Sequence, residues 1–124
     1  MMQDAKAATG CPLSRKFSFA WNGIKAAYRS EQSFRIQLVV SVAVVLAGGF
    51  LGLTQLEWLF VITAIGAVLS LELLNTTIEK TLDLLHPAQH ERVKFVKDVS
   101  AAAVFISSLA AAIVGLVVFA RYLF

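Results

Sequence analysis

Residues 99–120 of the chain read VSAAAVFISSLAAAIVGLVVFA, a run of 22 residues without a charged side chain. About 20 apolar residues in a helix cross the hydrocarbon core of a bilayer, so this run is long enough to span a membrane. Its apolar character is continuous, which excludes the alternating pattern of a transmembrane β-strand. Small residues such as Ala111 and Gly115 predict that the helix packs closely against a neighbouring helix.

Two further stretches have the same character. Residues 36–53 (IQLVVSVAVVLAGGFLGL) contain no charge, and residues 58–78 are apolar apart from Glu72, Asn75 and a few hydroxyl groups. The sequence therefore predicts an all-α membrane protein with three transmembrane helices. With their polar ends included, we expect the spans at about residues 34–53, 58–85 and 98–121.

The composition agrees with a membrane location. Of the 124 residues, 58% are hydrophobic and 15% are charged, and the mean hydropathy is +0.74. A typical soluble domain has about 45–50% apolar and about 25% charged residues. A soluble domain of this length has too little interior to hide so much apolar surface. The counts of seven glycines, two prolines and one cysteine also exclude collagen-like and disulfide-stapled chains.

Lysine and arginine are distributed unevenly between the connections. Six of them precede the first uncharged run at residues 36–53: Lys6, Arg15, Lys16, Lys25, Arg29 and Arg35. Residues 54–57 have none, residues 79–98 have four, and the C-terminal end has Arg121 alone. By the positive-inside rule, this predicts a multi-pass protein of the plasma membrane whose N-terminus and second connection are cytoplasmic. The net charge of +3 favours anionic lipid headgroups rather than nucleic acid.

The segment before the first span predicts a surface helix over residues 13–30. Four large side chains lie on one face of that helix: Phe17, Trp21, Ile24 and Tyr28. Basic and polar residues occupy the other faces, so the helix is expected to lie on the cytoplasmic membrane surface. Residues 1–12 are expected to be a flexible tail, and residues 13–124 a single membrane domain.

Residues 71–85, LELLNTTIEKTLDLL, contain the side chains that are the best candidates for a functional site. Glu72, Asn75, Glu79 and Asp83 are spaced at i, i+3, i+7 and i+11. On a helix they lie within about 40° of a common line and extend over about 16 Å. Intramembrane carboxylates are costly and usually functional. The alternative is that this acidic stripe only holds neighbouring helices together through hydrogen bonds.

The residues of the acidic stripe lie at two different depths in the membrane. Carboxylate and amide oxygens suit Mg²⁺ better than zinc. Glu79 is placed near the membrane interface, where Mg²⁺ carrying nucleotide phosphates can reach it, whereas Glu72 lies about two turns deeper, where it can take a proton from a lipid hydroxyl. A lysine such as Lys94 or Lys97 can offset phosphate charge. Because the chain has no phosphate-binding glycine loop, any nucleotide must be held in another way.

Three blocks resemble a known family. They are ELLNTTIEKTLDLL (72–85), HPAQHERVKFVKDVSAAAV (86–104) and FAWNGIKAAYRSEQSFRIQ (19–37). Together they resemble the small integral-membrane prokaryotic diacylglycerol kinases over about residues 15–120. The resemblance implies a homotrimer of three-span subunits that phosphorylates a lipid hydroxyl with ATP and Mg²⁺. It also implies active sites shared between subunits at the cytoplasmic interface. A lone subunit would otherwise leave its acids facing lipid, which also favours an oligomer.

The resemblance assigns roles residue by residue. It implies that Glu72 is the catalytic base with Asn75 beside it, and that Glu31 and Glu79 coordinate the metal together with the ATP phosphates. The nucleotide-contacting or supporting set is Asp83, Lys97 and Asp98, with His90 at a less certain interfacial position.

The lipid substrate is left between two alternatives. The WNGIK block, the IEK…HP pattern and Gln37, where the diacylglycerol type tends to have an acid, favour undecaprenol over diacylglycerol. Two functions of other classes are also considered. One is a small proton-coupled transporter with Glu72 as its proton relay, although such exporters generally have four spans. The other is a non-catalytic membrane subunit.

Overall fold

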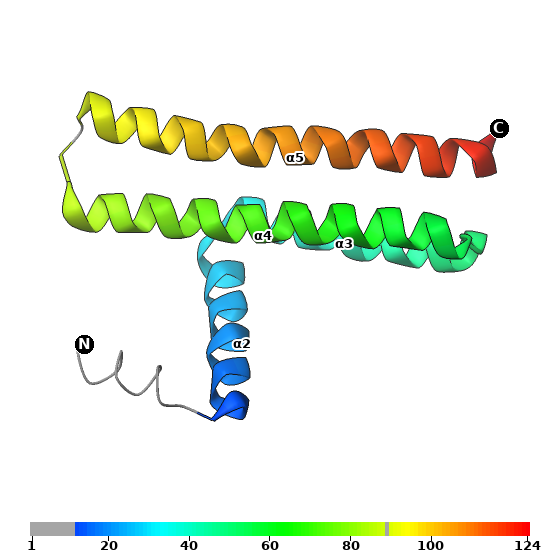
Figure 1. Ribbon diagram of the computed structural model, residues 1–124, viewed down its shortest axis with the longest axis horizontal. Helices are drawn as coiled ribbons and strands as arrows, with labels where there is room; N and C mark the ends of the chain where they lie inside the picture. Colours follow the sequence, from blue (N-terminus) through cyan, green and yellow to red (C-terminus); the bar gives the residue numbers. More distant parts are fainter. Residues whose placement is uncertain (1–11, 89) are drawn as a thin grey trace.

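A computed structural model describes residues 12–88 and 90–124, so the tail predicted at residues 1–12 lies outside the described residues except for Pro12. The described chain forms four helices: α2 (Leu13–Ser30), α3 (Gln32–Leu51), α4 (Gln55–Leu85) and α5 (Glu91–Leu123). The three long helices α3, α4 and α5 run alongside one another with alternating direction, whereas α2 is oriented crosswise to them and extends away from the bundle (Figure 1). The predicted all-α fold, a first helix followed by three apolar helices long enough to cross a membrane, is confirmed.

A single extended residue separates α2 from α3. Glu31 has φ −117° and ψ 111°, and its N–H donates to the carbonyl oxygen of Ala27. One residue outside helical geometry is enough to redirect the chain, so α3 leaves at a sharp corner (Figure 1). The corner places Glu31 beside Lys80, near the C-terminal end of α4. Helices α4 and α5 continue past the corner towards their own connection (Figure 1).

The turn between α3 and α4 is built by glycine and a capping box. Gly52 has φ 75°, a left-handed conformation that favours glycine, and its N–H donates to the Gly48 carbonyl oxygen over 2.9 Å. Thr54 then caps α4, because its hydroxyl accepts from the Glu57 N–H while the Glu57 carboxylate accepts from the Thr54 N–H. The helix therefore starts at Gln55.

The same end of the bundle is fastened by side chains. The Tyr122 hydroxyl donates to Glu57 Oε1 over 2.6 Å, and Arg121 pairs with the same oxygen at 3.0 Å. Next to them, Leu53, Val61 and Val118 form a small buried apolar cluster. These contacts join the start of α4 to the end of α5 and fix how the two helices lie against each other.

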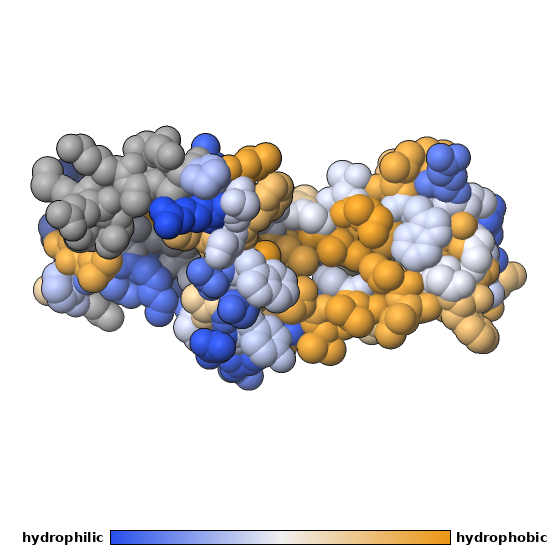
Figure 2. All heavy atoms as spheres, turned by 90° about the horizontal axis from the view of Figure 1, so that it is seen from below, coloured by the Kyte–Doolittle hydropathy of each residue, from blue (hydrophilic) through white to orange (hydrophobic). Residues whose placement is uncertain are grey.

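Most large apolar side chains lie on the outside. Phe50 is 91% exposed and Leu116 is 72% exposed, and the buried apolar residues are few. Figure 2 shows apolar side chains gathered over the part of the bundle between α2 and the α3–α4 turn. Three apolar helices with such a surface make the chain a multi-pass membrane protein, because lipid or neighbouring chains must cover these residues.

Candidate active site

The carboxylate of Glu72 is buried between α4 and α3, with 4% of the residue exposed. The Ser33 hydroxyl donates to Glu72 Oε1, and Gln37 Nε2 donates to Glu72 Oε2 over 3.3 Å. Both donors come from the first two turns of α3, one helical turn apart. Each oxygen of a buried carboxylate thus has a partner, which is the usual condition for burying such a group.

This burial corrects one expectation. The sequence suggested that the acids of a lone subunit face lipid until another subunit covers them. For Glu72 this is wrong, because α3 of the same chain already covers it. Helical spacing alone does not reveal this cover, since the donors precede Glu72 by 39 and 35 residues.

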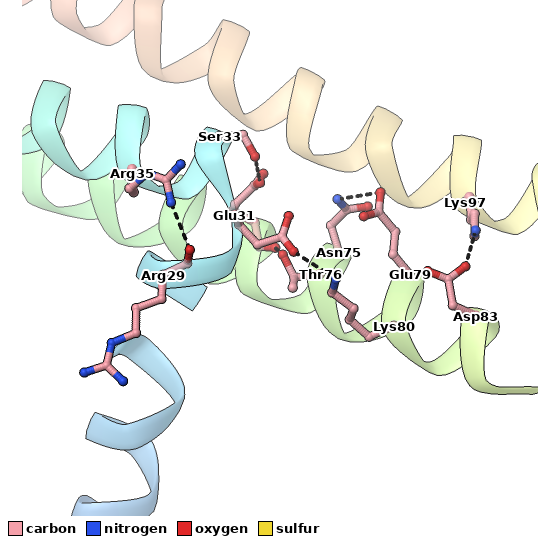
Figure 3. Close-up of polar contacts among 11 residues, drawn as sticks. Arg29, Glu31, Ser33, Arg35, Asn75, Thr76, Glu79, Lys80, Asp83 and Lys97 are labelled. Atoms are coloured by element: carbon pink, nitrogen blue, oxygen red, sulfur yellow. Dashed lines mark hydrogen bonds and ion pairs between the residues drawn. The ribbon is translucent and has the colours of Figure 1, made fainter. Parts of the chain in front are cut away.

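One turn further along α4, a second polar group connects α4 with α5. Asn75 Nδ2 donates to Glu79 Oε1 over 3.3 Å, and the Ser100 hydroxyl of α5 donates to Asn75 Oδ1 over 2.7 Å. Figure 3 shows Asn75 and Glu79 side by side on α4, facing α5. Asn75 therefore orients the Glu79 carboxylate and is itself fixed by Ser100.

Glu31 reaches the same part of α4 from the α2–α3 corner. Its Oε1 lies 3.4 Å from Lys80 Nζ, and its side chain is 19% exposed (Figure 3). Glu31 thus reaches Lys80, the residue that follows Glu79 on α4. Within residues 12–88 and 90–124, no three His, Cys, Asp or Glu side chains cluster closely enough to hold a metal by themselves.

The predicted nucleotide residues line an open pocket of about 450 Å³ at the α4–α5 connection. Asp83 Oδ1 pairs with Lys97 Nζ at 2.6 Å, and Asp98 Oδ2 pairs with Lys94 Nζ at 2.6 Å. His90 also lines this pocket. Its Nδ1 accepts from the Arg92 N–H over 3.1 Å and caps the N-terminus of α5, which is a structural role by itself.

The acidic stripe therefore faces two partners. Glu72 bonds to α3, whereas Asn75 and Asp83 bond to α5. The residues lie along one helix as predicted, but they divide into a buried group around Glu72 and an open pocket around Asp83. The two groups are 11 residues apart on α4, or about 16 Å along its axis.

Four residues that contact the predicted site were not among its predicted members: Ser33, Gln37, Lys80 and Ser100. A signal for the first two exists in the sequence, because Ser33 and Gln37 are polar residues at i and i+4 on a helix that is otherwise largely apolar. Lys80 and Ser100 have no such signal. Their partners become apparent only when α3 and α5 are placed against α4.

The polar groups of the site suit a divalent cation, phosphates and a hydroxyl. Mg²⁺ is commonly held by one or two carboxylates together with substrate phosphates and water. Glu31 and Glu79 offer that number of carboxylates, and Lys94 and Lys97 offer positive charge at the open pocket. A buried, hydrogen-bonded carboxylate such as Glu72 can accept a proton from a hydroxyl brought next to it.

Comparison with known proteins agrees with this chemistry. Residues 18–119 match the family model described as "Prokaryotic diacylglycerol kinase". The chain is 36% identical over 105 residues to "Undecaprenol kinase" of Bacillus subtilis (strain 168), a match that covers 85% of both chains. It is 35% identical over 105 residues to "Diacylglycerol kinase" of Haemophilus influenzae (strain ATCC 51907 / DSM 11121 / KW20 / Rd), covering 85% of this chain and 86% of the relative.

A third relative, "Diacylglycerol kinase" of Synechocystis sp. (strain ATCC 27184 / PCC 6803 / Kazusa), is 37% identical over 100 residues. This match covers 80% of the present chain and 57% of the relative. The matched region contains all four helices in whole or in large part. These findings favour a kinase over the transporter and the non-catalytic subunit considered above. The chain belongs to the prokaryotic diacylglycerol kinase family and is a membrane lipid kinase.

Proposed function

We propose that the chain transfers the γ-phosphate of ATP to the hydroxyl of undecaprenol, with Glu72 as the general base. The observation that carries this proposal is the burial of Glu72 with both carboxylate oxygens hydrogen-bonded by α3. Burying a carboxylate in this way is expensive, and packing alone does not require it. A fixed carboxylate at this depth is suited to accept the proton of a lipid alcohol.

In the proposed reaction, Glu72 accepts the hydroxyl proton as the lipid oxygen attacks the γ-phosphorus. Asn75 holds Glu79 in place through the hydrogen bond at 3.3 Å. Glu31 and Glu79 would hold Mg²⁺, which neutralises charge on the phosphates when it is bound. Lys97 and its partner Asp83 contact the nucleotide at the open pocket, together with Asp98 and His90.

The two polar groups also support a shared active site. The pocket around Asp83 and the buried carboxylate of Glu72 are about 16 Å apart along one helix. A neighbouring subunit that places its own pocket or its own Glu72 closer would complete the site. We therefore propose a homotrimer with active sites between subunits, and an orientation with the α4–α5 connection in the cytoplasm, as the distribution of lysine and arginine suggests.

An apolar groove supports the choice of lipid. It has a volume of about 310 Å³, lies between α3, α4 and α5, and is headed by Gln37 close to Glu72. Its other polar lining residues are Ser41 and Ser108. A polyprenol continues as hydrocarbon directly from its hydroxyl carbon, whereas diacylglycerol brings two ester groups that an apolar groove must desolvate. The relative named "Undecaprenol kinase" agrees with this choice, but relatives named "Diacylglycerol kinase" are equally similar.

Phosphate transfer to two lipids tests the substrate. Purified protein in detergent is given γ-labelled MgATP with undecaprenol or diacylglycerol in parallel reactions. We expect the higher kcat/KM with undecaprenol. A higher kcat/KM with diacylglycerol would reassign the substrate and keep the mechanism, whereas labelling of neither lipid by folded protein would overturn the proposed function.

A further inference from the structure

Gln37 connects the apolar groove with the buried carboxylate. Its Nε2 donates to Glu72 Oε2 over 3.3 Å, and its side chain lines the groove between α3, α4 and α5. Its Oε1 is buried and has no hydrogen-bond partner among the described residues. Buried polar atoms are paired in roughly nine of ten cases, so an acceptor left unpaired next to a proposed base requires an explanation.

We propose that Gln37 is a positioning residue for phosphate transfer: its amide nitrogen holds Glu72, and its amide oxygen accepts the hydrogen bond of the incoming lipid hydroxyl. This inference rests on the proposed role of Glu72 as the base. It holds for either lipid, because undecaprenol and diacylglycerol both carry one free hydroxyl.

The orientation of the amide follows from its neighbour. An ionised carboxylate only accepts hydrogen bonds, so the NH₂ group of Gln37 must face Glu72. The opposite orientation would bring two acceptor oxygens together. The Oε1 atom is therefore not the atom that contacts Glu72, and the group that satisfies it must be a donor. A lipid hydroxyl that arrives through the groove is such a donor.

The same amide then places the hydroxyl next to the base. The oxygen and nitrogen of Gln37 are bonded to one carbon, so a hydroxyl on Oε1 lies beside the carboxylate held by Nε2. The Ser33 hydroxyl donates to the other carboxylate oxygen and prevents Glu72 from rotating. Rotation about the lipid C–O bond turns the hydroxyl proton from Gln37 to Glu72.

The transfer step needs no reactant other than ATP and the lipid alcohol. The hydroxyl proton moves to Glu72, and the lipid oxygen forms its bond to the γ-phosphorus. The bond between the γ-phosphorus and the β–γ bridging oxygen breaks, and ADP leaves with that electron pair. Gln37 gains and loses nothing in this step, which distinguishes a positioning residue from the base.

Two variants separate positioning from space filling. Gln37→Met keeps the length of the side chain and removes both hydrogen bonds. We expect it to lower kcat/KM for the lipid by about 10–100-fold, because misplaced reacting groups lose rate on that scale, and to leave the KM for MgATP unchanged. Gln55→Met, at the opposite end of the bundle, is the matched control and should keep kcat/KM for the lipid.

The pH profile of kcat/KM for Gln37→Glu is a measurement that a change in packing alone would not alter. It places a second carboxylate beside Glu72, and two adjacent carboxylates do not ionise independently. The acidic limb of the pH profile of kcat/KM should therefore move to higher pH. The nearby charged groups Glu31, Lys80 and Glu79 are the same in every variant, so they do not account for the difference.

Failure of the proposed Gln37 role and failure of the proposed Glu72 role give different results. If Gln37→Met keeps the wild-type kcat/KM, or if Gln37→Glu keeps the wild-type pH profile, the inference about Gln37 is wrong. Glu72→Gln is measured in parallel to test the proposed function separately. An inactive Glu72→Gln variant beside a fully active Gln37→Met variant overturns only the positioning role, whereas an active Glu72→Gln variant overturns the proposed base.

Discussion

At the residue scale, each charged group near the proposed metal site has a partner within the chain. Lys80 Nζ lies 3.4 Å from Glu31 Oε1 and is 61% exposed on its side chain. Its positive charge competes with a cation for the same carboxylate. An ion pair with one exposed partner contributes little to stability, so it can be displaced when MgATP binds.

Lys80→Met should therefore lower the Mg²⁺ concentration needed for half-maximal activity by about 2–5-fold, the range expected when an exposed ion pair is removed. The measurement is a Mg²⁺ titration of phosphate transfer at saturating ATP and lipid. Lys25→Met on α2 removes an exposed positive charge elsewhere and serves as the control. A higher Mg²⁺ requirement in Lys80→Met would mean that Lys80 assists phosphate binding instead of competing with the metal.

The sequence predicted the types of residue at this site better than their partners. Helical spacing predicts that Glu72, Asn75, Glu79 and Asp83 lie on one face of a single helix. The partners of Glu72 cannot be predicted from residue spacing on α4, since they lie on α3 and meet Glu72 only when the two helices pack together. In the sequence, Gln37 indicates only the type of lipid, whereas in the structure it contacts the Glu72 carboxylate directly.

At the element scale, helix ends depend on a few local interactions. Long apolar runs predicted the three spans, but α5 begins at Glu91, well before its apolar run, because His90 caps it there. The Thr54–Glu57 capping box has the sequence signature of a helix start, so these two residue types by themselves indicate where α4 begins. Apolar patterning alone does not contain this information.

Gly48 tests the close contact at the α3–α4 turn. A Cβ atom there would lie 2.8 Å from Leu53 Cδ1 and 2.9 Å from Trp58 Cη2. Gly48→Ala should lower the free energy of unfolding in detergent by about 1–3 kcal/mol because it overpacks this contact. Gly49→Ala meets nothing within 4 Å and should raise stability by about 0.5–1 kcal/mol through helix propensity. Equal effects of the two variants would contradict this account of the turn.

At the scale of the whole molecule, the arrangement of the helices follows from the corner at Glu31. Periodicity predicted a surface helix before the first span, but not that one extended residue would direct α2 away from the bundle (Figure 1) and bring Glu31 beside Lys80. The largely apolar exterior requires lipid or partner chains around it. Neither the number of chains nor their contacts can be deduced from one amphipathic pattern.

Subunit mixing tests the proposed sharing of active sites. Glu72→Gln and Lys97→Met subunits are each expected to be inactive or nearly so, because one lacks the base and the other a nucleotide contact. If the base and the nucleotide pocket of one site come from different subunits, mixed oligomers regain activity in sites with two intact contributors. Mixtures no more active than their separate components would indicate that each subunit holds a complete site.

The turnover number of Glu72→Gln tests most directly whether Glu72 is the general base. The amide keeps the size of the side chain but is a far weaker base, so kcat should fall by about 10²–10⁴-fold. Glu57→Gln, which changes another acid of α4 at its opposite end, should keep kcat when assayed well below its unfolding temperature. A folded Glu72→Gln variant with near wild-type kcat would contradict the account, because the buried carboxylate would then be a packing element and not the base.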